Sequence, residues 1–220
     1  MKKIMFQFAL DGAYKKSKEL AVKMINDVKD KVDIVEIGTS FIFRYGLSFV
    51  KEVKEMFPNI KILADMKIMD GGYYNALMGF EYGADVVTVL GVSDSETIIK
   101  STNVAHSNNK KVMVDFLKVD DISGKLELCE KVGVDYICVH SGIDEQSKGI
   151  KPNDNLKNII NLVKKCKVAV AGGINETTLE NICKLEPEIV IIGAAISNEE
   201  NYAEIASNIR LILDKIERQL

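Results

Sequence analysis

The sequence alternates between short apolar runs and longer segments with apolar residues at helical intervals. The short runs are rich in β-branched residues, which is typical of strands that are buried on both faces. In the longer segments apolar residues recur every three or four positions, as at Leu20, Met24 and Val28. Eight runs have the strand pattern, at residues 4–10, 32–38, 60–66, 84–91, 111–117, 134–140, 167–173 and 188–195.

This alternation of strands and helices predicts parallel βαβ units. Eight units within 220 residues suit a compact (β/α)8 barrel, so we expect residues 1–220 to form one α/β domain, a TIM barrel. An open doubly wound sheet is the alternative, but it normally has fewer strands, and no GxGxxG sequence follows the first run. Segment 201–220 has apolar residues at helical intervals and predicts a helix after the eighth strand.

Composition narrows the class of protein. The chain is 47% hydrophobic and 28% charged, with a net charge of −3 and no concentrated Lys/Arg tract, so we expect no nucleic-acid partner. No apolar run approaches the roughly 20 residues of a membrane span, and the N-terminal run is too short for a signal peptide. The four cysteines form no CxxC pair, which fits free buried thiols in a reducing compartment. We therefore expect a cytoplasmic protein with no membrane partner.

Titratable residues gather where the predicted strands end. In a barrel these ends meet at one face, which carries the functional groups. A solvated turn would explain the charges of DMKIMD, residues 65–70, but not the acids and histidine at the ends of other apolar runs. Buried acids must be paired or bind a cation, so the pattern predicts a site for a cation and an anion. The residues concerned are Asp11, Glu36, Asp65, Lys67, Asp70, Asp115 and His140.

Glycines mark the ends of the last two predicted strands. Gly172 and Gly173 end the seventh run and Gly193 ends the eighth, and each junction is followed by a predicted helix. Backbone N–H groups at such junctions can face a phosphate without obstruction by side chains. A tight connection is the alternative for either junction alone. Both together favour a phosphate site.

The residue types at the strand ends suggest particular chemistry. Glu36 and Asp65 supply only a few hard oxygen ligands, which suits Mg²⁺, with Mn²⁺ also acceptable, and leaves positions for a chelating substrate. Lys67 would donate to a developing oxyanion, and Asp65 and Asp70 on either side would keep it charged, which argues against a Schiff base. His140 suits proton transfer near neutral pH.

At this point a family resemblance is visible. ADMKIMDGG, residues 64–72, resembles the Asp-x-Lys-x-x-Asp motif of the orotidine 5'-phosphate decarboxylase suprafamily. The likeness covers nearly the whole chain, through FALD, VEIGTSFIFRYGL, GADVVTVLG, VHSGIDEQ, VAVAGGI and IVIIGAAI. It is closest to the branch of 3-hexulose-6-phosphate synthase and 3-keto-L-gulonate-6-phosphate decarboxylase. The orotidine enzymes use no metal and lack a counterpart to Glu36.

Two positions favour the synthase within this branch. The decarboxylases typically read His-Arg-Ser-Arg-Asp after strand six, whereas residues 140–144 read HSGID, followed by Glu145 and Gln146. They usually have Gly-Arg after strand eight, whereas this chain has Gly193 and Ala194. The decarboxylase, or a related sugar-phosphate lyase, stays open as an alternative. A non-catalytic sugar-phosphate binding protein is a further alternative, against which the whole set of acids, lysine and histidine argues.

The resemblance implies an aldehyde-lyase reaction. Formaldehyde and D-ribulose 5-phosphate would condense reversibly to D-arabino-3-hexulose 6-phosphate through an enediolate. His140 would act as general base, Mg²⁺ on Glu36 and Asp65 would hold the enediolate oxygens, and Lys67 would stabilise the negative charge. Asp115 would orient the substrate hydroxyls.

The resemblance also implies roles for the remaining residues. Asp11 would hold substrate hydroxyls. Asp70 would cross a homodimer interface into the partner's site. Phosphate would lie against Gly172, Gly173, Gly193 and Ala194.

Overall fold

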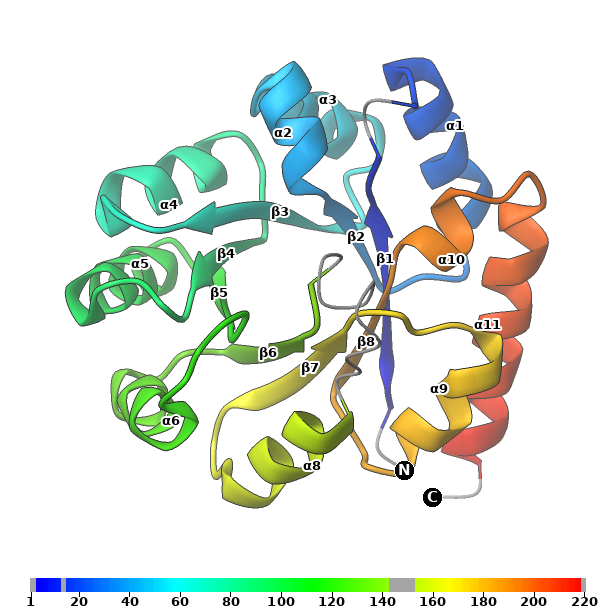
Figure 1. The fold of residues 1–220 in the computed structure, drawn as a ribbon. Coiled ribbons are helices and arrows are strands. Elements are labelled where there is room, and N and C mark those ends of the chain that lie inside the picture. Colours follow the sequence, from blue (N-terminus) through cyan, green and yellow to red (C-terminus); the bar gives the residue numbers. More distant parts are fainter. Residues whose placement is uncertain (1–2, 13–14, 143–152, 219–220) are drawn as a thin grey trace.

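The computed structural model describes residues 3–12, 15–142 and 153–218. Eight parallel strands close into a barrel in sequence order, with the eighth strand paired to the first (Figure 1). This confirms the predicted (β/α)8 fold, and every strand lies within or overlaps a predicted run. The strands are β1 Met5–Leu10, β2 Ile34–Ile37, β3 Lys61–Ile68, β4 Val86–Leu90, β5 Lys111–Asp115, β6 Tyr136–His140, β7 Lys167–Ala171 and β8 Ile189–Ile192.

Helices surround the barrel and follow the strands (Figure 1). Two helices instead of one follow β2, and a short helix stands between β8 and the predicted final helix. The helices are α1 Lys18–Val28, α2 Thr39–Tyr45, α3 Ser48–Met56, α4 Gly72–Glu81, α5 Ser95–Ser107, α6 Ile122–Val132, α8 Asn153–Leu162, α9 Glu176–Cys183, α10 Ala194–Ser197 and α11 Tyr202–Glu217.

Local signals in the sequence set several of these helix ends. Side chains of Ser17, Asp94 and Asn175 accept hydrogen bonds from backbone N–H groups in the first turns of α1, α5 and α9. Such caps satisfy donors that lack a partner within the helix. Gly133 ends α6 with a φ of 82°, a conformation that glycine adopts without strain. These residues therefore fix where the four helices begin or end.

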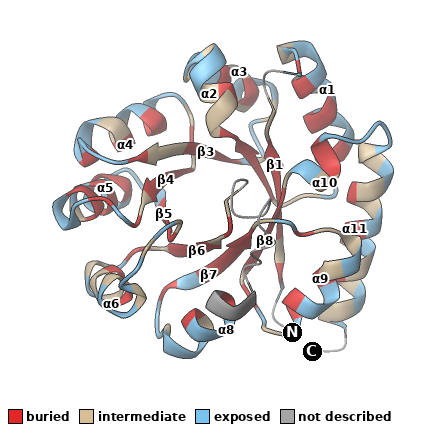
Figure 2. Ribbon diagram, in the orientation of Figure 1, coloured by how far each residue is buried: buried red, intermediate tan, exposed pale blue. Residues whose placement is uncertain are grey.

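Two apolar layers hold the barrel together. The outer layer lies between strands and helices and includes Val35, Ile62 and Val87, and most of the strand residues are red, that is buried, in Figure 2. The inner cluster fills the barrel itself, because alternate strand residues point to opposite faces. Its members are Ala9, Ile34, Leu63, Val86, Met113, Tyr136, Cys138, Ala169, Ala171, Ile189 and Ile191.

The inner face becomes polar toward the carboxyl ends of the strands. On β3 the next inward residue after Leu63 is Asp65. On β6 the next inward residue after Cys138 is His140. The same alternation puts buried polar side chains on β1, β2, β4 and β5. An apolar floor therefore lies beneath a polar barrel mouth.

The structure also bears on membrane-spanning helices and on the state of the cysteines. No helix among the described residues combines the length and apolar character needed to span a membrane. All four cysteines are buried and unpaired, as predicted.

Candidate active site

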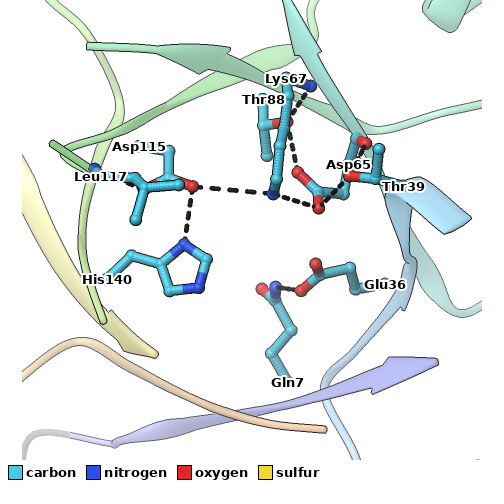
Figure 3. Close-up of polar contacts among 9 residues, drawn as sticks. All are labelled: Gln7, Glu36, Thr39, Asp65, Lys67, Thr88, Asp115, Leu117 and His140. Carbon is cyan, nitrogen blue, oxygen red and sulfur yellow. Dashed lines mark hydrogen bonds and ion pairs between the residues drawn. The ribbon is translucent and has the colours of Figure 1, made fainter. Parts of the chain in front are cut away.

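The third strand is irregular where it carries its charges. Ala64 pairs with Val87 and Ile68 pairs with Val89, so three residues of β3 lie opposite one residue of β4, Thr88. Lys67, inside this bulge, has a backbone φ of 45°, a value that residues other than glycine rarely adopt. The bulge directs Asp65 and Lys67 together into the barrel mouth (Figure 3).

Asp65 is the most heavily hydrogen-bonded acid of the mouth. Its Oδ2 accepts hydrogen bonds from Lys67 Nζ at 2.6 Å and Thr39 Oγ1 at 2.6 Å. Its Oδ1 accepts one from Thr88 Oγ1 at 2.7 Å. Burial alone would raise the pKa of Asp65, but the charge of Lys67 and these hydrogen bonds lower it below the ordinary value. Asp65 is therefore an ionised, fixed carboxylate.

Lys67 lies between two carboxylates, and the second is not the predicted one. Its ammonium nitrogen is 3.8 Å from Asp115 Oδ2 as well as bonded to Asp65. Burial opposes the charged form, but Asp65 and Asp115 outweigh it and raise the pKa of Lys67. Asp70 is exposed beyond the strand, where its carboxylate accepts a hydrogen bond from Gly71 N. Within this chain the second carboxylate beside Lys67 is thus Asp115 and not Asp70.

His140 and Asp115 form a pair at the ends of adjacent strands. The His140 Nδ1 lies 2.8 Å from Asp115 Oδ2, and Asp115 Oδ1 accepts a hydrogen bond from Leu117 N at 2.9 Å. A carboxylate partner places the proton on Nδ1, which leaves Nε2 as the basic nitrogen. Burial would lower the pKa of His140, but the hydrogen bond and charge of Asp115 raise it above 6.5.

Glu36 and Gln7 form the opposite side of the mouth (Figure 3). Gln7 Nε2 donates a hydrogen bond to Glu36 Oε2 at 2.6 Å, and both residues are buried. Burial, followed by the charges of Asp65 and Asp11, raises the pKa of Glu36 well above 4.5. The buried Gln7 Oε1 has no hydrogen-bond partner among the described residues. This side therefore has unused acceptors and an excess of negative charge, which a cation would offset.

Asp11 reaches the mouth from the end of β1. A Cβ on Gly38 would overlap the Asp11 carboxylate, whereas one on Gly193 would lie 3.5 Å from Asp11 Oδ2. Burial, then the charge of Asp65, raises the pKa of Asp11. The buried Lys16 ammonium donates to Asp11 O at 3.0 Å and to Asn198 Oδ1 at 3.3 Å, so it ties this loop to α10.

The glycines predicted to cradle phosphate occupy the ends of β7 and β8. Gly172 and Gly173 have φ values of 109° and 66°, and Gly193 precedes α10, whose first residue is Ala194. A Cβ on Gly172 would collide with the backbone of Ser141. The tight connection therefore accounts for Gly172 by itself, and the backbone groups of all four residues lie on the same side of the barrel as the charged cluster.

A family model described as Orotidine 5'-phosphate decarboxylase / HUMPS family matches residues 5–209. The chain belongs to this family. A protein of Bacillus subtilis (strain 168) named 3-hexulose-6-phosphate synthase is 42% identical over 88% of the chain and 92% of its own length. One of the same name from Staphylococcus aureus (strain NCTC 8325 / PS 47) is 41% identical over 90% and 94%.

A solved family member gives the same result in three dimensions. The crystal structure of 3-hexulose-6-phosphate synthase from Salmonella typhimurium has a TM-score of 0.92 and 39% identity, and covers 96% of this chain and 99% of its own. The resemblance predicted from the sequence, in both suprafamily and branch, is thereby confirmed.

The family motif is only partly gathered into one site in this chain. Asp65, Lys67, Asp115 and His140 form one connected chain of contacts, which Figure 3 shows facing Glu36. Asp70, the last residue of the motif, is outside it. The synthase-like pattern from Ile143 to Gln146 lies outside the described residues.

Four residues with evident roles were not expected from the sequence. They are Gln7, Gly38, Thr39 and Thr88. Gln7 and Thr88 each interrupt an apolar run with a polar side chain of inward parity, which is a weak signal that could have been noticed. Gly38 and Thr39 follow the second strand directly, where a barrel carries its function.

Proposed function

We propose that this protein is a 3-hexulose-6-phosphate synthase, which condenses formaldehyde with D-ribulose 5-phosphate to D-arabino-3-hexulose 6-phosphate, reversibly. The observation that carries the proposal is the contact chain from Asp65 through Lys67 and Asp115 to His140, facing Glu36. It combines a base, a fixed cation and two candidate metal ligands in one mouth. The relatives named for this activity match about nine tenths of the chain. A cytoplasmic location stays a prediction.

The donor set fits a divalent cation, Mg²⁺ or Mn²⁺, held by Glu36 and Asp65. Within the described residues no group of three or more His, Cys, Asp or Glu side chains could hold a metal ion. Two carboxylates suit Mg²⁺, which keeps its other positions for water and substrate. The raised pKa of Glu36 and the unpartnered Gln7 Oε1 support a missing positive charge there. When bound, the cation would act as a Lewis acid toward adjacent substrate oxygens.

The side chains of the mouth have complementary parts in the proposed reaction. Nε2 of His140 removes a proton from C1 of the sugar phosphate, while Asp115 holds Nδ1–H and stabilises the imidazolium. Lys67, kept charged by Asp65 and Asp115, stabilises the negative charge that develops on the substrate oxygen. Asp11 binds substrate hydroxyls. The resulting carbon nucleophile attacks formaldehyde, and the new alkoxide takes a proton.

Phosphate would bind through backbone N–H groups of Gly172, Gly173, Gly193 and Ala194. The positive φ values of Gly172 and Gly173 support this, since consecutive residues with unusual backbone conformations can form an anion-binding concavity. Ala194 offers no positive charge, so phosphate binding would depend more on the backbone N–H groups.

A direct assay tests the proposal. Purified protein is mixed with formaldehyde and ribulose 5-phosphate, with and without a chelator, and consumption of both is followed. We expect turnover that stops with chelator and returns with Mg²⁺ or Mn²⁺. CO₂ release from 3-keto-L-gulonate 6-phosphate is measured in parallel. Appreciable decarboxylation without formaldehyde consumption would reject the synthase in favour of the decarboxylase.

We also propose a homodimer in which Asp70 enters the partner's site. Apolar side chains next to Asp70 are unusually exposed, with Tyr74 at 75% and Met69 at 52%, and Tyr73 and Met78 also exposed on α4. Several exposed apolar side chains close together in the sequence are typical of a protein–protein interface.

Mixing two inactive variants tests the dimer. Asp70→Ala chains and Lys67→Ala chains are unfolded together and refolded. If Asp70 acts across the interface, half of the dimers are mixed and each has one intact site, so activity returns to about a quarter of wild type. No recovery from mixtures whose chains do exchange, as shown by a tag on one variant, would place Asp70 in its own chain's site or outside catalysis.

A further inference from the structure

The backbone of Lys67 needs support from its neighbours. A φ of 45° is rare for a residue that has a Cβ, and such a backbone conformation persists only when the surrounding structure holds it. The conformation matters for the site, because it lets the ammonium nitrogen approach Asp65 Oδ2 to 2.6 Å and Asp115 Oδ2 to 3.8 Å.

Thr88 provides this support through one hydroxyl group. Its Oγ1 accepts a hydrogen bond from Lys67 N at 2.9 Å and donates one to Asp65 Oδ1 at 2.7 Å. The residue is 4% exposed, so water does not compete freely for either bond. Thr88 is also the single residue of β4 opposite the three-residue bulge of β3. A hydroxyl can donate and accept at once, which valine of the same shape cannot do.

We propose that Thr88 is a positioning residue that holds the Lys67 backbone and the Asp65 carboxylate in one arrangement, so that the ammonium group faces the barrel mouth between Asp65 and Asp115. Thr88 acts through these two residues and not on the substrate. The consequence for catalysis rests on the proposed function, whereas the structural role does not.

Thr39 provides an internal comparison. Its Oγ1 donates to Asp65 Oδ2 at 2.6 Å and to Asp65 O at 2.8 Å. Thr39 comes from α2, however, and the Lys67 N–H donates to Thr88 instead. Loss of the Thr39 hydroxyl should loosen Asp65 alone. Loss of the Thr88 hydroxyl should release Asp65 and the Lys67 backbone together.

The test compares Thr88→Val, Thr88→Ser and Thr39→Val with a matched control, Thr102→Val. Thr102 is a buried threonine whose hydroxyl bonds only to Ile98 O in its own helix, among the contacts described. We expect Thr88→Val to lower kcat about 100-fold, as a displacement of roughly 1 Å can do, with KM for ribulose 5-phosphate changed much less. The kcat of Thr88→Ser should stay within a few-fold of the wild-type value. The kcat of Thr102→Val should equal the wild-type value.

Crystal structures of the variants separate this proposal from the proposed function. In Thr88→Val we expect Lys67 to leave its positive φ and its Nζ to withdraw from Asp115, whereas Thr88→Ser and Thr39→Val keep both. An unchanged Lys67 in the valine variant, or an unchanged kcat, overturns the positioning role. If wild-type protein lacks synthase activity, the proposed function fails and the structures still decide the role of Thr88. Should Thr88→Val not fold, Thr88→Ala is judged by the same criteria.

Discussion

Burial and neighbouring groups shift the pKa values of Lys67, Asp65, Glu36 and His140 in the barrel mouth. Lys67 stays charged because Asp65 and Asp115 face it, and Asp65 stays ionised because Lys67 and two threonine hydroxyls bond to it. Burial instead raises the pKa of Glu36. The hydrogen bond and charge of Asp115 raise the pKa of His140 above its ordinary value. An imidazole suits proton transfer near neutral pH, so His140 is the group we propose for this role.

The pH dependence of the rate should follow His140. A base must be neutral to accept a proton, so kcat/KM should rise as pH increases through a pKa above 6.5. Asp115→Asn removes the charge that raises this pKa, so the rising limb should move to lower pH and the maximal rate should fall about 10- to 100-fold. Rates from pH 5 to 9 measure both effects.

A second histidine supplies the control for this experiment. Asp135 pairs with His106 at 3.2 Å outside the barrel mouth. Asp135→Asn should therefore leave the rising limb where it is. A limb that stays in place in Asp115→Asn would mean that His140 is not the group being titrated.

Elements differ in how far the sequence reveals them. The eight strands were predictable because parallel strands buried on both faces must be apolar throughout, and the titratable residues at their ends stood out against that background. The bulge in β3 was not predictable, because it depends on how Ala64 and Ile68 pair with a different strand. Asp115, 48 residues further along, lies beside Lys67 in this chain, whereas the sequence pattern pointed to Asp70. A pattern local in sequence could not show that contact.

The turn from β2 into α2 depends on a missing side chain. In Gly38→Ala the new Cβ would overlap the Asp11 carboxylate and lie 2.7 Å from Leu10 O, which is backbone and cannot swing away. We expect a lower melting temperature and at least a 10-fold loss of kcat/KM, because Asp11 must move. Thermal unfolding and steady-state kinetics measure these effects.

Gly193→Ala is the matched comparison for stability. Its Cβ would make only ordinary contacts, at 3.4 Å and beyond, so the melting temperature should stay close to wild type. Equal melting temperatures of the Gly38→Ala and wild-type proteins would refute the steric argument.

The molecule as a whole combines a stable apolar barrel with a mouth that opposes folding. Four carboxylates, Asp11, Glu36, Asp65 and Asp115, gather at the barrel mouth with Lys67, and the pKa values of Asp11 and Glu36 are raised. The proposed function of Glu36 therefore conflicts with stability. Because the folded state raises its pKa, the folded protein binds this proton more tightly than the unfolded chain. Stability contributed by Glu36 should thus fall as pH rises from about 4.5 through the folded-state pKa.

Replacement of Glu36 should reverse this conflict. In chelator at neutral pH, we expect Glu36→Gln to melt above wild type, by about 2–4 °C for each kcal/mol of relieved burial cost, with the gap closing toward pH 4.5. Mg²⁺ should stabilise wild type and not the variant. Calorimetry at two pH values, with and without Mg²⁺, measures all of this.

Glu52→Gln serves as a control at the surface. Glu52 forms a partly exposed ion pair with Lys18, so its replacement should change the melting temperature little. If Glu36→Gln instead lowers the melting temperature at neutral pH, Glu36 does not destabilise the metal-free folded protein.

The apolar floor of the barrel has a kinetic consequence. Side chains such as Leu63, Met113 and Ile189 fill the barrel below the charged cluster, so among the described residues the cluster is open only at the carboxyl ends of the strands. In the proposed reaction a phosphorylated sugar and a one-carbon aldehyde would therefore enter by the same route, and the smaller molecule is the one that can arrive second. We expect ordered binding, with the sugar ester bound first and its elongated product released last.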